Sequence, residues 1–136
     1  MSGTRDALTL HDRIDGLAVF LEAFASPTFV FGTMDCTPGV VPFYEFTETA
    51  AQFIQAAYDL GWVLTDFDWS SWDDAHRYVG DPAAVEHASI ADIERLLTAH
   101  IRQDRFCEGH LGAMYDSGHL TAILRRLCAI AEEAEP

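Results

Sequence analysis

Residues 89–106 read SIADIERLLTAHIRQDRF and carry the clearest helical pattern in the chain. Ser89 followed by Asp92 is typical of a helix N-terminus, because side-chain oxygens there accept hydrogen bonds from the free amides of the first turn. Apolar residues then recur every three or four positions, as one buried helix face requires: Ile90, Ile93, Leu97 and Ile101. The segment therefore predicts a central helix from Ile90 to about Phe106.

Further helices are predicted on both sides of this segment. Thr9 with Asp12, and Thr49 with Gln52, resemble the capping pairs of two earlier helices. A last helix is indicated by the apolar spacing of Leu120, Ile123, Leu124, Leu127, Cys128 and Ala131. Residues 28–46, rich in Pro, Gly and aromatic side chains, leave room for a small hairpin. Helix follows helix without βαβ alternation, so we expect an all-α, compact single-domain bundle of about five helices over residues 1–136.

The charge of the chain limits its partners. The 136 residues include 22 Asp and Glu against eight basic residues, all of them Arg, for a formal net charge of −14. Binding of nucleic acid or of an anionic membrane needs clustered cations, so neither is expected. Residues 1–94 hold 16 of the acids and three Arg, whereas residues 95–136 hold six acids and five Arg. An acidic surface is thus predicted in the first two-thirds of the chain.

The termini and the cysteines indicate a cytoplasmic protein. Residues 1–16 are polar and lack the apolar core of a signal peptide, and the apolar stretch 17–25 is too short to span a bilayer. Three cysteines without C-x-x-C spacing favour reduced thiols over a disulfide framework. The expected location is therefore the cytoplasm.

A dense set of polar side chains follows the central pattern. It comprises His100, Arg102, Asp104, Arg105, Cys107, Glu108 and His110. On a helix continued past Phe106, Asp104 and Glu108 would lie on the line of the buried stripe. One hypothesis is structural: these carboxylates form buried ion pairs with Arg and fix how two helices meet. The other is functional: Arg102 and Arg105 bind an anion in a cleft while a carboxylate or a His transfers protons.

Other chemistries find weaker support in the sequence. Cys107 with His110 could form a thiol nucleophile and its base, but no third orienting group is apparent. The spacing of His100, Cys107, His110 and His119 matches no standard zinc pattern. A calcium loop beginning at Asp66 would need Gly and Glu where Ser71 and Arg77 stand. Phosphate-binding and dinucleotide motifs are absent from the sequence, so we predict neither a metal nor a cofactor.

Several segments resemble a bacterial family of uncharacterised domains, known only as a domain of unknown function. The most specific is the run RQDRFCEGHL at residues 102–111, with the signature R-x-D-R-F-C-E-G-x-L. Residues 14–17, 67–69, 117–119 and 123–124 are similar too. The resemblance spans most of the chain and implies one domain, but it implies no activity, substrate or cofactor.

The sequence leaves three functions open. The first is an acidic helical binding or regulatory module that acts through a protein partner. The second is a small enzyme or ligand-binding protein, with the Arg, Asp, Glu and His side chains around an anionic small molecule. The third is mimicry of DNA by the acidic surface, whose simplest alternative is plain solubility. Catalytic residues are not assigned by any of the three.

Overall fold

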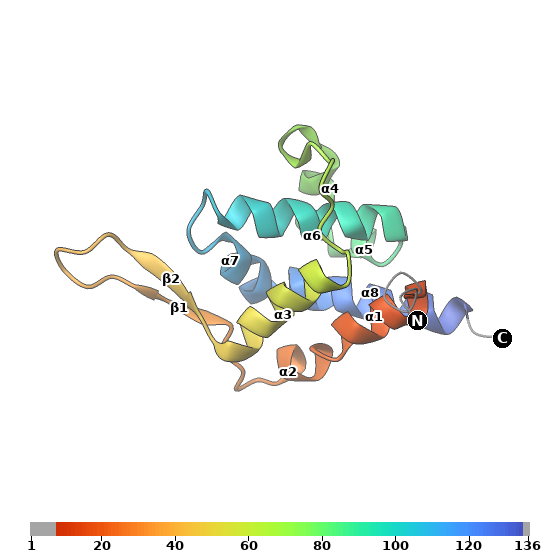
Figure 1. Cartoon of the computed structure of the whole chain (residues 1–136), viewed down its shortest axis with the longest axis horizontal. Helices are drawn as coiled ribbons and strands as arrows, with labels where there is room; N and C mark the ends of the chain where they lie inside the picture. Colours follow the sequence, from red (N-terminus) through yellow and green to blue (C-terminus); the bar gives the residue numbers. More distant parts are fainter. Residues whose placement is uncertain (1–7, 135–136) are drawn as a thin grey trace, which may run out of the picture.

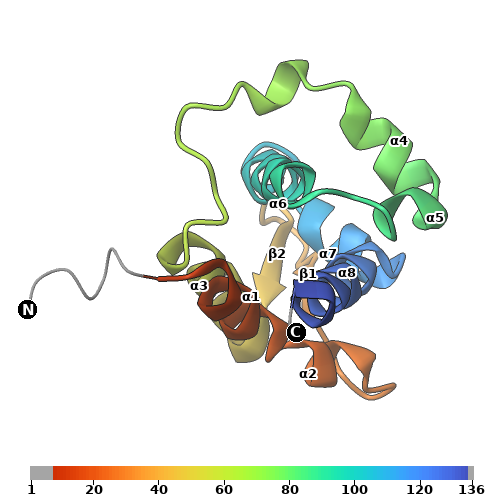
Figure 2. The same ribbon diagram turned by 90° about the vertical axis from the view of Figure 1, so that its right-hand side faces the viewer.

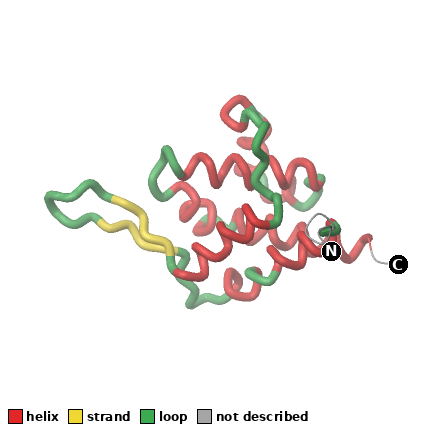
Figure 3. Tube along the Cα trace, in the orientation of Figure 1, coloured by secondary structure: helices red, strands yellow, loops and turns green. Residues whose placement is uncertain are grey.

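The computed structural model describes residues 8–134, and most of these residues are helical (Figures 1 and 3). The prediction of an all-α fold with a small hairpin is confirmed. The described elements run in the order α1 (Leu10–Ala18), α2 (Leu21–Ala25), β1 (Gly32–Asp35), β2 (Phe43–Phe46), α3 (Glu48–Asp59), η2 (Trp69–Ser71, a 3-10 turn), α4 (Asp74–Gly80), α5 (Pro82–Val85), α6 (Ile90–Asp104), α7 (His110–Asp116) and α8 (His119–Ala134). The predictions for residues 1–7 and 135–136 fall outside the described part.

The core is formed by buried apolar residues of α1, α3, α6 and α8. Figure 2 shows how these helices are arranged. Ile93, Leu97 and Ile101 of α6 are buried, as their spacing predicts. Leu120, Ile123, Leu124 and Leu127 of α8 are fully buried as well. The buried apolar side chains of the described residues form one contiguous cluster. Burying each of these side chains stabilises the fold by about 1.5–3 kcal/mol before the entropy of ordering is subtracted.

The helix starts follow local capping chemistry. The Ser89 hydroxyl accepts from the Asp92 amide at 3.1 Å, and Thr9 and Asp12 form a reciprocal capping box on α1. These two predictions are confirmed. The Thr49–Gln52 pair was the wrong choice for α3, whose N-cap is Thr47. Thr47 is favoured because its hydroxyl both caps the helix and donates to the carbonyl of Val30 at 2.9 Å, which joins α3 to the chain before the hairpin.

The hairpin β1–β2 projects away from the helices (Figure 1). Its antiparallel register pairs Gly32 with Phe46 and Asp35 with Phe43. Tyr44 connects it to the helical body, since the Tyr44 ring lies against Gly112 of α7 so closely that a Cβ at residue 112 would overlap the ring. Residue 112 must therefore be glycine for the hairpin to dock as it does.

Residues 65–81, here called the arch, leave the helical body after α3, pass around α6 and return to it at α5 (Figure 2). The arch contains η2 and α4. Near its far end the Tyr78 hydroxyl donates to the Asp92 carboxylate on α6. The arch also carries the exposed carboxylates that the charge distribution predicts: Asp66, Asp68, Asp73, Asp74 and Asp81. No helix in the described residues is long and apolar enough to cross a membrane.

Candidate functional site

The segment that carries the family resemblance forms the turn between α6 and α7. The helix ends at Asp104, two residues before the predicted end, and Gly109 has a φ of 86° that turns the chain into α7. Glycine adopts this left-handed conformation without a steric penalty. Because the chain turns here, Glu108 does not continue the buried stripe of α6, as a longer helix would have required.

The Asp104 side chain caps α7, whose own N-cap residue provides no side-chain hydrogen bond. Its carboxylate accepts a hydrogen bond from the Leu111 amide at 2.9 Å, at the start of α7. Gly109, the N-cap residue of α7, has no side chain to do so. Burial raises the pKa of the Asp104 carboxyl above its usual value, and the negative charge of Glu108 adds to the rise, while the Leu111 hydrogen bond opposes it. Asp104 thus fixes the position of α7.

Glu108 and Arg102 also make contacts to backbone. The Glu108 carboxylate accepts from the Tyr44 amide of β2 at 2.6 Å, and Arg102 donates to the Leu64 carbonyl at 3.2 Å, just before the arch. Among the described residues, no ion pair joins Arg102 or Arg105 to Asp104 or Glu108. Both earlier hypotheses assumed that these side chains act together, whereas Arg102, Asp104 and Glu108 each bind a different backbone group. Arg105 itself is exposed.

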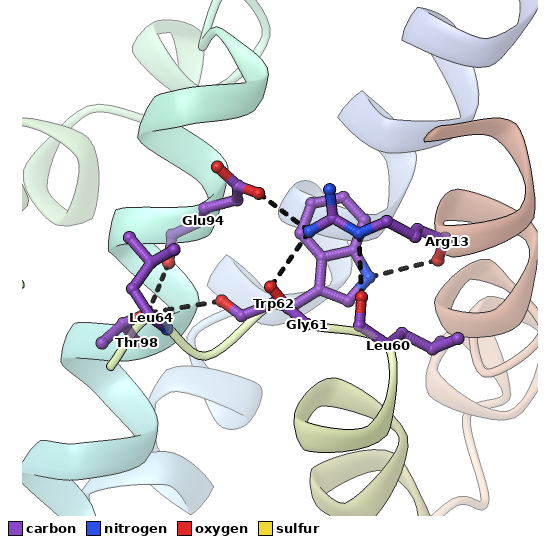
Figure 4. Close-up of polar contacts among 7 residues, drawn as sticks. All are labelled: Arg13, Leu60, Gly61, Trp62, Leu64, Glu94 and Thr98. Carbon is purple, nitrogen blue, oxygen red and sulfur yellow. Dashed lines mark hydrogen bonds and ion pairs between the residues drawn. The ribbon is translucent and has the colours of Figure 1, made fainter. Parts of the chain in front are cut away.

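A second polar network holds the segment that leads into the arch (Figure 4). Arg13 of α1 donates to the carbonyls of Leu60 and Gly61 at 2.8 and 3.1 Å, and to the Glu94 carboxylate at 2.8 Å. Its guanidinium lies 4.3 Å from the Trp62 ring centre. The same segment is held to α6 through the Leu64 amide, which donates to the Thr98 hydroxyl at 2.8 Å. The network therefore joins α1, the end of α3 and α6.

Three histidines from three helices form a row in the interior. Nδ1 of His100 lies 3.1 Å from Nε2 of His110, and Nε2 of His100 lies 3.0 Å from Nε2 of His119. His100 and His119 are buried, and His110 is half-buried. The sequence placed His100 and His110 in the candidate site, and it considered His119 only as a zinc ligand. Only the packing of α6, α7 and α8 brings the three rings together.

Burial keeps these imidazoles uncharged. Loss of solvation, with smaller contributions from His119 and His110, lowers the pKa of His100 to about 3. Loss of solvation, with a smaller contribution from His110, lowers the pKa of His119 to about 4. Burial also lowers the pKa of His110, although the nearby Asp104 carboxylate raises it in part. Each neutral ring offers one N–H donor and one lone pair, which is what a row of N–H···N hydrogen bonds needs.

The row does not form a metal centre. His100 uses its two nitrogens, on opposite sides of the ring, for different neighbours. No group of three or more His, Cys, Asp or Glu within residues 8–134 is arranged to hold a metal ion. Cys107 is an exposed free thiol, and Nε2 of His110 faces His100 instead, so the structure does not assemble the thiol–imidazole pair considered above.

A pocket of about 360 Å³ lies between the arch and the histidine row. Its volume is in the range of small-molecule sites. The arch provides one wall, and α6 and α7 provide the other. The lining residues are Trp69, Ser70, Trp72, Ala75, His76, Val79, Ala99, His100, Gln103, His110 and Met114. Sequence reasoning found His100 and His110 but not the two tryptophans or Gln103.

The pocket lining combines apolar side chains with side chains that can form hydrogen bonds, and it contains no Arg, Lys, Asp or Glu. Trp69 also stacks on Phe106, with ring centres 6.0 Å apart. Phe106 is 79% exposed, which is unusual for so large an apolar ring. Phe106 therefore adds exposed aromatic surface beside Trp69, which lines the pocket.

Most residues of the R-x-D-R-F-C-E-G-x-L segment thus lie outside the pocket lining, and some of them hold the elements that form the pocket walls. Arg102 holds the start of the arch, and Asp104 holds α7, which carries His110. Of this segment, Gln103 and His110 line the pocket.

The fold and this site define a mostly α-helical domain with an uncharged pocket beside a buried histidine row. The model of a family of unknown function (DUF6508) matches residues 9–133, and the chain belongs to that family. No curated protein and no solved structure matches the chain.

Proposed function

We propose that the protein binds a small, uncharged molecule with a planar ring in the pocket between the arch and α6. The observation that carries the proposal is the pocket lining, which combines two tryptophans with three histidines. Specific ligand sites combine largely apolar walls with a few polar groups that set orientation, and this lining has that composition.

The chemistry of the lining favours a neutral ligand. A planar ring gains stacking or edge-to-face contacts with Trp69 and Trp72. His110 and Gln103 offer hydrogen bonds from uncharged groups, since the pKa of His110 is lowered by burial. A charged ligand would lose hydration without finding an opposite charge, which is costly. The anionic ligand considered from the sequence depended on Arg102 and Arg105, and neither lines the pocket.

The proposal can be tested with two neutral probes of similar size, indole and quinoline, and two charged ones, benzoate and benzamidine. Binding would be followed by NMR through the side-chain N–H signals of Trp69 and Trp72. We expect saturable shifts with the neutral probes and at least tenfold weaker binding of the charged ones. Tighter binding of benzoate would overturn the proposal in favour of an anion site.

A pair of variants adds a structural control. Ala75 is a half-buried lining residue on α4, so Ala75→Phe fills the pocket and should abolish indole binding. Ala51 is exposed on α3 and outside the lining, so Ala51→Phe adds the same ring without effect. Equal loss of binding in both variants would place the probe elsewhere.

A second candidate is a protein partner that docks on the arch. The carboxylates of the arch are exposed, and they suit electrostatic recognition of a basic protein surface. Pull-down experiments at low and high salt test this idea, because screening weakens contacts between exposed charges. Recovery of a partner that does not depend on salt, or of none, would count against it.

We also propose a cytoplasmic location for the protein. The support is chemical: Cys36 and Cys107 are exposed free thiols, and Cys128 is a half-buried one. Unpaired thiols persist in a reducing compartment. Cell fractionation with an antibody to the protein would test the location.

A further inference from the structure

The histidine row extends beyond the pocket. His100 and His110 line the pocket, whereas His119, at the first position of α8, does not. The three rings are linked in the order His110, His100, His119 by two N···N contacts of 3.1 and 3.0 Å. A group hydrogen-bonded to His110 in the pocket is therefore connected to His119 through the imidazoles of His110 and His100.

Each end of the row has a ring nitrogen that the row itself does not use. Nδ1 of His110 and Nδ1 of His119 make no hydrogen bond to any described residue. Every buried side-chain nitrogen or oxygen in that part of the chain has a hydrogen-bond partner. The two unpartnered Nδ1 atoms are consequently not fully enclosed, although the His119 ring as a whole is buried. One lies on a ring that lines the pocket and the other on a ring outside it.

We propose that the row is a proton relay in which the hydrogen bond that a ligand makes to His110 sets the tautomer of His119. The proposal rests on ligand binding in the pocket, as proposed above. His119 is then a positioning residue, because it acts on the ligand through His100 and His110 and does not touch it.

The relay has two states with equal numbers of hydrogen bonds. In the first, Nε2–H of His110 donates to Nδ1 of His100, Nε2–H of His100 donates to Nε2 of His119, and His119 carries its proton on Nδ1. In the second, every donor and acceptor is exchanged, so that His110 carries its proton on Nδ1 and His119 on Nε2. Both states are uncharged, and both satisfy the two contacts in the structure.

The passage from the first state to the second balances in protons. Nδ1 of His110 takes a proton from water. One N–H proton then moves from His110 to His100, and another moves from His100 to His119. Nδ1 of His119 releases its proton to water. Each ring begins and ends neutral, and no oxidant or other reactant takes part. Asp104 acts electrostatically on His110 and stabilises the positive charge that the first step creates.

A ligand favours one state or the other according to whether it offers a hydrogen-bond donor or an acceptor to Nδ1 of His110. A donor such as indole N–H needs the lone pair and favours the first state. An acceptor such as the quinoline nitrogen needs the N–H and favours the second. One hydrogen bond of ordinary strength biases two otherwise equal states by up to about tenfold.

The test is long-range ¹H–¹⁵N NMR of the histidine rings, which reports the protonated nitrogen of each neutral imidazole. Indole and quinoline are added separately to the full chain, and binding is followed at Trp69 and Trp72. We expect the proton of His119 to move toward Nδ1 with indole and toward Nε2 with quinoline. If both probes bind and His119 keeps the same tautomer, the relay is wrong while the ligand site stands.

If neither probe binds, the proposed ligand class fails, and the relay is tested without ligand. His110→Phe removes the pocket end of the row, whereas His76→Phe alters a lining histidine outside it. The relay predicts a changed tautomer population at His119 in the first variant only. An unchanged His119 in both variants overturns it. His110→Met, which also lacks the ring donor and acceptor, serves the same purpose if the Phe variant does not fold.

Discussion

Nε2 of His119 lies 3.0 Å from Nε2 of His100, in the buried contact between α8 and α6. The two rings are nearly perpendicular, with an interplanar angle of 90° and centres 4.8 Å apart. Polar side chains this deeply buried must be hydrogen-bonded to be tolerated. Here each neutral imidazole is the hydrogen-bond partner of the other, and His100 also contacts His110, which lines the pocket.

The histidine row should make the protein sensitive to mild acid. An unfolded His titrates near pH 6.5, whereas the pKa values of His100 and His119 in the fold are about 3 and about 4. The unfolded state therefore binds protons first, and stability falls as the pH drops below 6.5. Between pH 6.5 and 5 we expect a loss of about 2 kcal/mol for each of the two rings, measured by urea unfolding.

Two features sharpen this prediction. The raised pKa of Asp104 works in the opposite direction, since a fold that holds a proton more readily gains stability in acid. His76 is exposed, so His76→Gln should leave the pH dependence unchanged. A free energy of unfolding that stays constant from pH 7 to pH 5 would contradict burial of neutral imidazoles.

Asp104 should be replaceable by Asn but not by Ala. Asp104→Ala removes the acceptor for the Leu111 amide, and loss of a helix cap costs about 0.5–2 kcal/mol. Asp104→Asn keeps an acceptor and removes a carboxylate whose pKa is raised by burial, so its cost should be smaller. Denaturant unfolding of both variants measures the difference. Equal costs would show that the charge, and not the cap, is what α7 needs.

Gly112→Ala should release the hairpin from α7. A Cβ at residue 112 would overlap the Tyr44 ring, and crowding of this kind typically costs about 1–3 kcal/mol. Gly80→Ala is the matched control, because nothing lies within 4 Å of a Cβ at that position. Unfolding free energies, together with hydrogen exchange of the Tyr44 amide, would follow the effect. Unchanged exchange in the residue 112 variant would rule out the docking described here.

Arg13 should not be replaceable by Lys. Its planar guanidinium donates to two carbonyls and to Glu94 while lying over Trp62, and a single ammonium cannot reproduce that arrangement. We expect Arg13→Lys to cost about 1–3 kcal/mol in the free energy of unfolding. Arg125 is exposed and makes no ion pair or ring contact with the described residues, so Arg125→Lys should cost less than about 0.5 kcal/mol. Similar costs at both sites would mean that the Arg13 network adds little stability.

Local rules were enough to predict much of the fold. The spacing of Ile93, Leu97 and Ile101 identified the buried face of α6, and Ser89 identified its start, because both depend on neighbours along the chain. The end of α6 was placed two residues too late. No proline marks it, and Gly109 follows only five residues after Asp104. The cap that Asp104 provides to α7 is a contact between two helices, which periodicity does not describe.

The candidate site was predicted only in part, for the same reason. His100 and His110 stood out as titratable residues near one another in sequence, but His119 joins them through the packing of α8. Trp69 and Trp72 reach the pocket because the arch passes around α6, and nothing in their local sequence specifies that path. The Arg residues were expected to act together with acids, whereas Arg102 instead donates to a backbone carbonyl.

The most direct test of the ligand site is a crystal structure of the protein soaked with quinoline. The proposed function predicts one ring in the pocket, between the arch and α6, with its nitrogen within hydrogen-bond distance of the His110 imidazole. Quinoline bound elsewhere on the molecule, with the space between Trp69, Trp72 and His110 left unfilled, would contradict it.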